Sequence, residues 1–348
     1  MLISEVKAGM VLARDIIDDN GNLLLEQGIA LTEYYITRLT QLGITSIPIY
    51  DPYAVELKKH SVIAPEVREE LTLCFRSLFN KKSQDILNSG LRTIYLKQIQ
   101  QTVGQVIDNT EKNLGQIVNV QVRQPTEDEI AHAINVCLMA ISTGLYIKLP
   151  RPVLMDLAMG ALFHDLGKTV MPTIEGSIAS DPGRLHPMYG QQLLVKNKLG
   201  TIVARIAAEH HEQYDGQGYP LGLAGKEIHP LSRIVTIANH FDNNMNMAAK
   251  TGQPRGKIID SMLANGNTLF DMYLLRAFFH TTPLYPVGTL VKLSTNQMAY
   301  VIKNKARFAA TPTVQIAERG PRGYNMITGQ MIDLAMKPQI TIVDVIAD

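Results

Sequence analysis

The stretch LMDLAMGALFHDLGK, residues 154–168, is apolar until its end, where a histidine, an aspartate and a lysine stand close together. A helix this apolar is buried on most sides, so it needs partner helices and points His164 and Asp165 toward them. A carboxylate buried there without a partner carries a heavy desolvation cost, which a metal ion removes. Lys168 follows His164 by four residues, on nearly the same helical face, and could meet an anion at the metal. The stretch therefore predicts a helical bundle with a metal site inside it.

Most of the nine histidines of the chain fall between residues 125 and 283, at or near apolar helical segments. Taken singly, each histidine is best explained as an ordinary core or surface residue. As a set that includes carboxylates, they predict a metal site, and sites of this type commonly hold two ions. Imidazole and carboxylate donors together suit iron, manganese, zinc or cobalt, whereas magnesium favours oxygen ligands. The candidate ligands are Asp128, His132, His164, Asp165, His186, His210 and His211.

The two ends of the chain have a different pattern from this helical region. Residues 1–55 predict a small α+β unit: the strand-like runs VLARDIID and NLLLEQG flank the turn residues 19–21. Thr32 is the predicted N-cap of a helix that ends at Gly43, before the strand-like ITSIPIY. Residues 286–348 contain alternating and β-branched runs separated by turn residues, which predict a small β-rich appendage. We expect a mainly α protein with these two additions.

The segment 60–120 is helical in pattern but holds no group of chemically active residues. We interpret it as a helical linker or a dimerisation stalk, which makes a homodimer the expected oligomer. The helical core is then expected within residues 121–285.

Composition excludes several classes of partner. The chain has 33 Lys and Arg against 32 Asp and Glu, so no general attraction for DNA, RNA or an anionic membrane follows. Cys74 and Cys137 lie in apolar helical patterns that resemble neither a disulfide framework nor a cysteine zinc site, which favours a reducing, cytoplasmic location. The start MLISEVKAGM lacks the pattern of a signal peptide, and no apolar run approaches the ~20 residues of a membrane span.

The motif FHDLGK, followed by HHEQYDGQGYP at residues 210–220, resembles the HD-GYP branch of the HD-domain metal phosphohydrolases. The resemblance runs from about Thr126 to about Gly288, and the long Gly-Tyr-Pro element makes it specific. The first fifty residues resemble a unit found attached to such domains, and LYPVGTLVKLS is similar to their usual continuation.

This resemblance implies an all-helical core with two or three iron or manganese ions that hydrolyses cyclic di-GMP to pGpG or GMP in bacterial signalling. It implies that His132, His164 and Asp165 bind one ion, and that Asp165 bridges to a second. That second ion would be held by His186, His210 and His211, with Asp128 as a ligand of a third. Lys168 would contact the scissile phosphate or assist the leaving oxygen.

The Gly-Tyr-Pro loop and two arginines are the candidates for binding substrate or a partner. The glycines permit backbone shapes closed to other residues, so the loop could cover the metal site or form a docking surface. A tight turn between helices is the alternative interpretation. Surface charge is the alternative for the arginines. The residues concerned are Arg184, Asp215, Gly216, Gly218, Tyr219, Pro220 and Arg233.

Three features depart from the family pattern. Asn239 stands where the family has a carboxylate ligand, and a neutral amide would weaken binding of the first ion. His240 and Asp242 lie one and three residues later, so neither is a simple geometric replacement. NNMNMAAKTGQPRG replaces an arginine-rich stretch, and the loop before His186, DPGRLHPMYG, is shortened.

Three functions remain open from the sequence. The first is a cyclic di-GMP phosphodiesterase that retains most family ligands. The second is a degenerate HD-GYP module that binds cyclic di-GMP, or docks GGDEF-type diguanylate cyclase domains, without efficient turnover. The third is an HD phosphohydrolase of another nucleotide, against which the Gly-Tyr-Pro element argues. The metal, the product and the signal sensed by the first fifty residues are not decided at this stage.

Overall fold

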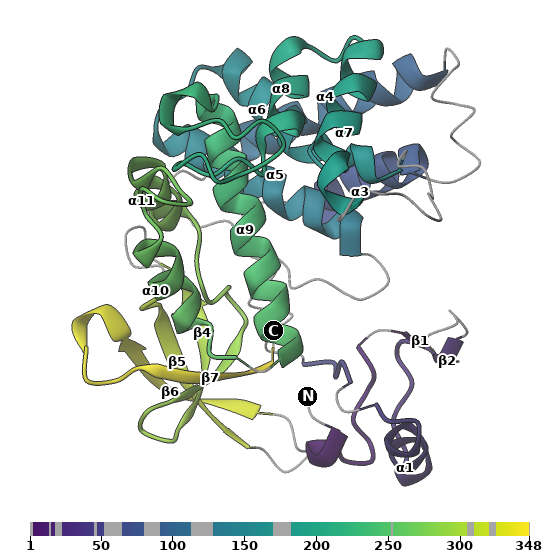
Figure 1. Ribbon diagram of the computed structural model, residues 1–348. Coiled ribbons are helices and arrows are strands. Elements are labelled where there is room, and N and C mark those ends of the chain that lie inside the picture. Colours follow the sequence, from purple (N-terminus) through teal and green to yellow (C-terminus); the bar gives the residue numbers. More distant parts are fainter. Residues whose placement is uncertain are drawn as a thin grey trace. The chain divides into compact units, whose positions relative to one another are not determined.

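The computed structural model of the chain describes residues 3–13, 15–17, 23–44, 47–51, 65–79, 91–112, 128–169, 182–251, 253–304, 310–319 and 325–347. The contacts divide the chain into two compact units, each described here by itself (Figure 1). The helical unit comprises Ser61–Leu284 and Lys305–Ala310, and the mixed unit comprises Met1–His60, Tyr285–Asn304 and Thr311–Asp348. The prediction of a mainly α protein with a helical core and a C-terminal β-rich part is confirmed.

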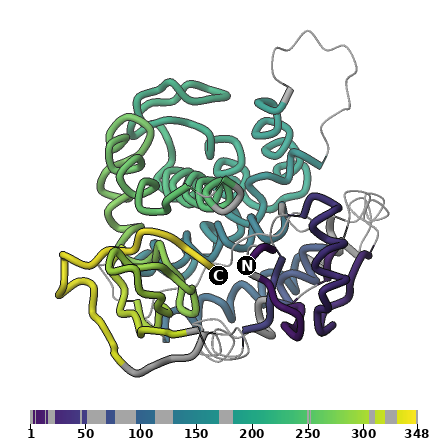
Figure 2. The backbone as a smooth tube through the Cα atoms, turned by 90° about the horizontal axis from the view of Figure 1, so that it is seen from below, coloured from purple at the N-terminus to yellow at the C-terminus, as the bar shows by residue number. Residues whose placement is uncertain are grey.

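The helical unit has α5 (Asp128–Tyr146) at its centre, because this helix packs on α6, α9 and α11. Helix α6 packs in turn on α8, and α8 packs on α7. Figure 2 shows α9 nearly end-on. The other helices are α3 (Pro65–Phe79), α4 (Leu91–Lys112), α6 (Arg151–Phe163), α7 (His186–Lys196), α8 (Thr201–Glu209), α9 (Pro230–Thr251), α10 (Gly256–Ala264) and α11 (Met272–Thr281), with short 3-10 helices η4 (Leu166–Thr169), η5 (Pro182–Leu185) and η6 (Gly225–Glu227).

One window of α5, Glu129–Tyr146, is long and apolar enough to cross a membrane by length and composition. Of that window, 72% is buried inside the protein, as expected of the central helix of a bundle. Among the described residues, this is the one helix that passes the test.

The segment predicted as a linker or stalk supplies α3 and α4. These helices pack on each other and on the bundle, α3 against α5 and α4 against α5 and α6. The rings of Phe75 and Phe163 have centroids 5.4 Å apart. The described part of this segment therefore belongs to the compact helical unit, and its role in dimerisation stays a prediction. Cys74 and Cys137 are both buried, and neither takes part in a disulfide among the described residues.

The contact of α6 with α8 depends on a glycine. A Cβ atom built on Gly160 would lie 2.3 Å from Ile206 Cδ1 and 2.9 Å from Ile206 Cβ. The two helices can approach this closely because residue 160 has no side chain. This approach brings the C-terminal ends of both helices, which carry site residues, into the same region of the unit.

We expect Gly160→Ala to lower the free energy of unfolding by about 1–3 kcal/mol, because the added methyl group overpacks the α6–α8 contact. Gly104→Ala on α4 is the matched control: its nearest neighbours to an added Cβ are Arg151 Nη2 at 3.7 Å and Met155 Cε at 3.9 Å. The control should be neutral or more stable by up to about 1 kcal/mol. Urea denaturation measures both, and equal stability of the two variants would contradict the interpretation.

The N-terminal part of the mixed unit contains a short hairpin and one helix. Strands β1 (Ile16–Ile17) and β2 (Leu23–Leu25) pair antiparallel, and the predicted turn residues 19–21 lie outside the described residues. Helix α1 (Glu33–Gln41) begins as predicted, with Thr32 Oγ1 accepting from Tyr35 N at 3.3 Å. It is followed by Gly43 at φ +78°, the left-handed conformation expected there. In the predicted strand ITSIPIY, only Ile49 forms a described bridge, to Leu12.

The C-terminal part of the mixed unit is an antiparallel sheet in the order β6-β5-β4-β3-β7. The buried Tyr300 of β4 donates a hydrogen bond from its hydroxyl to Asp51, so the two ends of the chain meet within this unit. The sequence predicted two separate additions, residues 1–55 and residues 286–348. That these two segments are separate domains stays a prediction. The strands are β3 (Leu290–Leu293), β4 (Met298–Lys303), β5 (Thr313–Arg319), β6 (Asn325–Asp333) and β7 (Ile342–Ala347).

Candidate metal centre

Three of the site histidines stand at helix ends. His164 follows the last residue of α6, His186 begins α7, and His210 follows the last residue of α8. Each Nδ1 lies within hydrogen-bonding distance of a backbone carbonyl three residues earlier: 2.7 Å from Ala161 O, 2.6 Å from Gly183 O and 2.8 Å from Ala207 O, respectively. A proton on Nδ1 satisfies these carbonyls and leaves a lone pair on Nε2. The backbone thereby fixes the tautomer in which Nε2 of each imidazole can coordinate a metal ion.

His132 lies in the second turn of α5 and is oriented by a side chain instead. Its Nδ1 is 2.7 Å from Asp242 Oδ2, while Asp242 Oδ1 accepts from Asn135 Nδ2 at 2.9 Å. Such a carboxylate fixes the tautomer and ring orientation of a ligating histidine and raises its basicity. Sequence reasoning weighed Asp242 only as a replacement ligand and missed this role. The spacing of His132 and Asn135, two polar residues on one face of an apolar helix, is the signal that could have indicated it.

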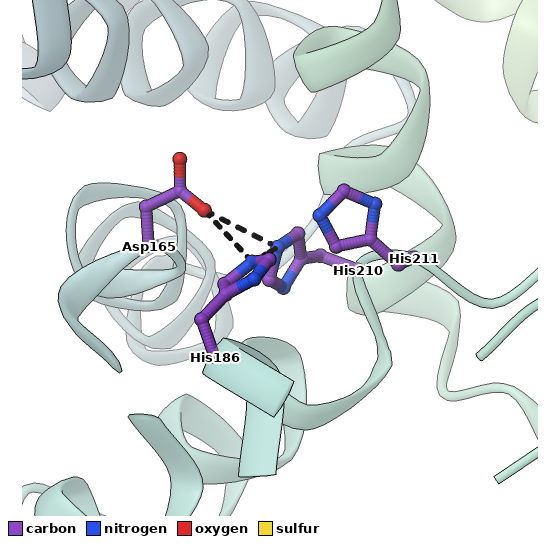
Figure 3. Close-up of side chains that lie close together, drawn as sticks. All are labelled: Asp165, His186, His210 and His211. Atoms are coloured by element: carbon purple, nitrogen blue, oxygen red, sulfur yellow. Dashed lines mark hydrogen bonds and ion pairs between the residues drawn. The ribbon is translucent and has the colours of Figure 1, made fainter. Parts of the chain in front are cut away.

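Asp165 lies between two pairs of imidazoles. Its Oδ1 is 3.1 Å from His186 Nε2 and 3.5 Å from His210 Nε2, the contacts drawn in Figure 3. Its Oδ2 is 3.4 Å from His164 Nε2 and 3.7 Å from His132 Nε2. One carboxylate therefore faces both pairs, each through a different oxygen.

Two groups of potential ligand atoms follow, and they share Asp165. The first group is His132, His164 and Asp165, and the second is Asp165, His186, His210 and His211, with ligand atoms within 4.8 Å of one another in each. The structure thus brings together six predicted ligands. Asp128 begins α5, four residues before His132, but its side chain lies outside those that the structure describes.

The donor set fits a cation. His164 Nε2 is 3.2 Å from His132 Nε2, and His186 Nε2 is 3.1 Å from His210 Nε2, although the protons of all four rings are needed at Nδ1. Two lone pairs at such a distance repel unless a positive charge lies near them. Asp165 Oδ1 is buried and, among the described residues, accepts no hydrogen bond of good geometry. A divalent metal ion satisfies all of these atoms at once.

The protonation states agree with this interpretation. Burial lowers the pKa of His132 and of His211, and lowers the pKa of His210 to about 4, because it disfavours the charged imidazolium. Burial alone would raise the pKa of Asp165, but the imidazoles beside it, His164 first, hold that pKa well below its usual range. At neutral pH Asp165 is therefore ionised, and His132, His210 and His211 are neutral.

Asn239, the predicted doubtful ligand, is buried on α9, one turn before Asp242. Its Oδ1 accepts a hydrogen bond from Asn243 Nδ2 at 2.8 Å. The amide oxygen that would have to coordinate an ion is thus already engaged.

Lys168 lies on η4, beside the centre. Its Nζ donates to Asp165 Oδ2 at 2.5 Å, and its side chain is 39% exposed, against 15% for Asp165. Lys168 is therefore placed where the centre opens to solvent, as expected of a residue that meets an anionic ligand.

The Gly-Tyr-Pro loop is held by hydrogen bonds to the carboxylate of a buried residue, Glu212. Glu212 accepts from Leu221 N at 2.6 Å through Oε1 and from Leu223 N at 3.0 Å through Oε2. Gly218 is required by a close approach, since an added Cβ would lie 2.2 Å from Gln213 N. Gly216 has φ +83°, next to an Asp215 whose Oδ1 accepts from Gln217 N at 3.1 Å. The loop is thus an ordered element, and sequence reasoning missed the role of Glu212.

A stack of planar groups joins this loop to the centre. The ring of Tyr219 lies parallel to that of His211, with centroids 4.6 Å apart and an interplanar angle of 13°. The exposed Arg184 places its guanidinium 4.5 Å from the centroid of the Tyr219 ring. Tyr219 precedes Pro220 through a cis peptide bond. Arg184 and Tyr219 thus lie together beside a candidate ligand, as a substrate or docking role requires.

Arg233 makes a contact between two helices that the sequence did not predict. Its Nη1 donates to Asp271 Oδ2 at 2.5 Å, while Asp271 Oδ1 caps α11 by accepting from Tyr273 N at 2.9 Å and Leu274 N at 3.2 Å. With a side chain only 14% exposed, Arg233 holds α9 and α11 together. The predicted contact of Arg233 with substrate stays a prediction.

Comparison with known proteins agrees with this geometry. The family model described as "HD domain" matches residues 116–274. The cyclic di-GMP phosphodiesterase PA4108 of Pseudomonas aeruginosa is 31% identical over 232 residues, 63% of this chain and 55% of that protein. The 3'3'-cGAMP-specific phosphodiesterase 3 of Vibrio cholerae is 33% identical over 141 residues, 37% of this chain and 30% of that protein. The solved structure of Bd1817, a HDG"Y"P protein from Bdellovibrio bacteriovorus, has 16% identity and a TM-score of 0.47, over 80% of this chain and 97% of that chain.

Residues 116–274 therefore match an HD domain. The His164–Asp165 pair and the Gly218–Tyr219–Pro220 loop are the residues by which the chain resembles the HD-GYP branch of the HD-domain proteins. The chain spans about half the length of the first of these relatives, 55%, and 30% of the second.

We expect Asp242→Asn to weaken binding of Mn²⁺ by roughly 10–100-fold, because the amide supports the His132 tautomer less well and sets a second NH₂ group against Asn135. Competition with a chelator measures the change. Asp260→Asn, on the exposed surface of α10, is the control with the same loss of charge. Unchanged affinity in Asp242→Asn would show that His132 needs no such orientation.

We expect Glu212→Gln to loosen the Gly-Tyr-Pro loop by about 1–3 kcal/mol, because one of its two acceptor oxygens becomes a donor that faces a backbone N–H. Hydrogen exchange at Leu221 and Leu223 should become faster, while the helices keep their protection. The exposed Glu129→Gln on α5 controls for the charge. Unchanged exchange at both amides would disprove the anchoring role.

Proposed function

We propose that this protein hydrolyses the phosphodiester bond of cyclic di-GMP, with pGpG or GMP as product, at the centre around Asp165. The observation that carries the proposal is the single carboxylate shared by two pairs of imidazoles, with both oxygens facing donors at 3.1–3.7 Å. Such a donor set is suited to two divalent ions side by side. The name of the first relative supports this substrate, and that of the second supports a cyclic dinucleotide as the substrate class.

We propose iron or manganese as the metal, as the resemblance to the HD-GYP branch implies, and the imidazole and carboxylate donors are compatible with both. His132, His164 and Asp165 would hold one ion, and Asp165, His186, His210 and His211 the other. When bound, the ions would lower the pKa of water and stabilise the charge that develops on the phosphoryl group. The side chain of Asp128 is the proposed source of a further ligand.

The residues of this chain have distinct tasks in the reaction. The backbone carbonyls behind His164, His186 and His210, and the carboxylate of Asp242 behind His132, hold the proton at Nδ1 and aim Nε2 inward. Lys168, at the opening, binds the substrate phosphate or donates a proton to the leaving oxygen. Burial of the imidazoles excludes bulk water, which strengthens each of these electrostatic contacts.

Arg184 and Tyr219 form the proposed contact surface for the rest of the ligand. The exposed guanidinium stacked on the tyrosine ring can meet a second phosphate or a base. The same surface could dock a GGDEF-type diguanylate cyclase domain. A homodimer and a cytoplasmic location complete the proposal, as expected from the sequence.

One observation favours the alternative of a binding module without efficient turnover. Asn239 contributes no charge, and its oxygen is engaged by Asn243. If the first ion binds too weakly, the protein would retain cyclic di-GMP on the loop surface without cleaving it.

The test is hydrolysis by the intact protein purified without oxygen, with bound iron and manganese quantified. We expect cyclic di-GMP to be cleaved faster than 3'3'-cGAMP, and His164→Ala to lose roughly 100-fold or more, since even an outer-shell partner of a metal ligand contributes up to about that factor. His280→Ala, outside both ligand groups, should retain activity. No turnover by the native protein, with activity gained in Asn239→Asp, would establish the binding module instead.

A further inference from the structure

The two sides of the centre are unequal in the ligands they offer. The side of His186 has four candidate donors in Asp165, His186, His210 and His211, which is enough to complete a tetrahedral site. Among the described residues, the side of His132 has three, and one of them is the carboxylate that it shares with the other side. An ion at His132 and His164 therefore needs at least one further ligand.

On α9, Asp242 and Asn239 are the two candidates for that ligand, and the oxygens of both already accept hydrogen bonds. Both oxygens of Asp242 are engaged, one with His132 at 2.7 Å and the other with Asn135 at 2.9 Å. Asn239 lies one turn before Asp242, and its oxygen accepts from Asn243 at 2.8 Å. Neither residue offers an oxygen without a partner, so an oxygen from outside the protein would meet less competition at this position.

Charge points in the same direction. Asp165 is the single carboxylate in both ligand groups, and the ammonium of Lys168 already lies 2.5 Å from it. Two divalent ions side by side would bring four positive charges to this one carboxylate, with Asp242 behind His132 as a second negative charge, in a site where burial weakens screening. A second ion is therefore strongly disfavoured until another negative group enters the centre.

We propose that the ion on the His186 side is resident, whereas the ion on the His132 side binds together with a phosphate group of the ligand. This inference rests on the proposed function, because the natural anion would be the phosphodiester of the substrate. The phosphate oxygen supplies both the fourth ligand and the missing charge, and Lys168 lies where the anion enters. Because linkage is reciprocal, metal and phosphate raise each other's affinity by the same factor. Substrate thus assembles the centre that cleaves it.

The test is titration of the metal-free protein with Mn²⁺, followed by electron paramagnetic resonance of free and bound Mn²⁺. Without phosphate, we expect one tightly bound ion, and a second that binds at least about 10-fold more weakly. Saturating inorganic phosphate should tighten the second ion by about 10-fold or more and produce the signal of a coupled pair of ions. Potassium chloride at the same ionic strength should not.

Variants of α9 separate the ligand from general charge. Asn239→Asp supplies a built-in carboxylate, so its second ion should bind tightly with or without phosphate. Asn246→Asp is the matched control, since it adds the same charge about 10 Å further along α9, two turns away. Circular dichroism checks that both variants are folded. The phosphate effect on the native protein is measured without any substitution, so the test does not depend on the variants.

The outcomes distinguish the two proposals. Two ions of equal affinity without phosphate would overturn this inference even if the protein hydrolyses cyclic di-GMP. A second ion that depends on phosphate, in a protein that hydrolyses no cyclic dinucleotide, would support the inference and reject the proposed function. An effect of chloride as large as that of phosphate would also overturn it.

Discussion

The structure depends on one partly buried carboxylate that faces imidazoles on two sides. Asp165 is 3.1 Å from His186 on one side and 3.4 Å from His164 on the other. Around it, the helices are arranged so that each imidazole is held by a group behind it, in three cases a carbonyl at a helix end. The folded chain therefore fixes proton positions before any ligand arrives, which is the preorganisation that electrostatic catalysis needs.

Much of this centre could be predicted from the sequence because its residues are costly to bury without a purpose. His164 and Asp165 at the end of an apolar helix indicated both a bundle and a metal. The glycines of the loop and the cap at Thr32 follow from backbone stereochemistry, which acts over a few residues and is visible in a short stretch of sequence. Local chemistry was thus a reliable guide to local structure.

The features of the site that the sequence did not predict depend on contacts between residues far apart in the chain. Asp242 faces His132 because α9 packs on α5, and Arg233 pairs with Asp271 because α9 also packs on α11. No periodicity within α9 reveals which partner each of its polar residues meets. For the same reason the pattern of residues 60–120 could not show that α3 and α4 pack on the bundle.

The arrangement of the ligands along the chain also bears on how the protein assembles. The donors come from α5, α6, α7 and α8 or from the residues that end them, so the unfolded chain holds no preformed site. Ions in the medium then select the native state by mass action and stabilise it. The mixed unit contributes none of these donors. Metal starvation therefore acts directly on the helical unit, whose residues supply the donors.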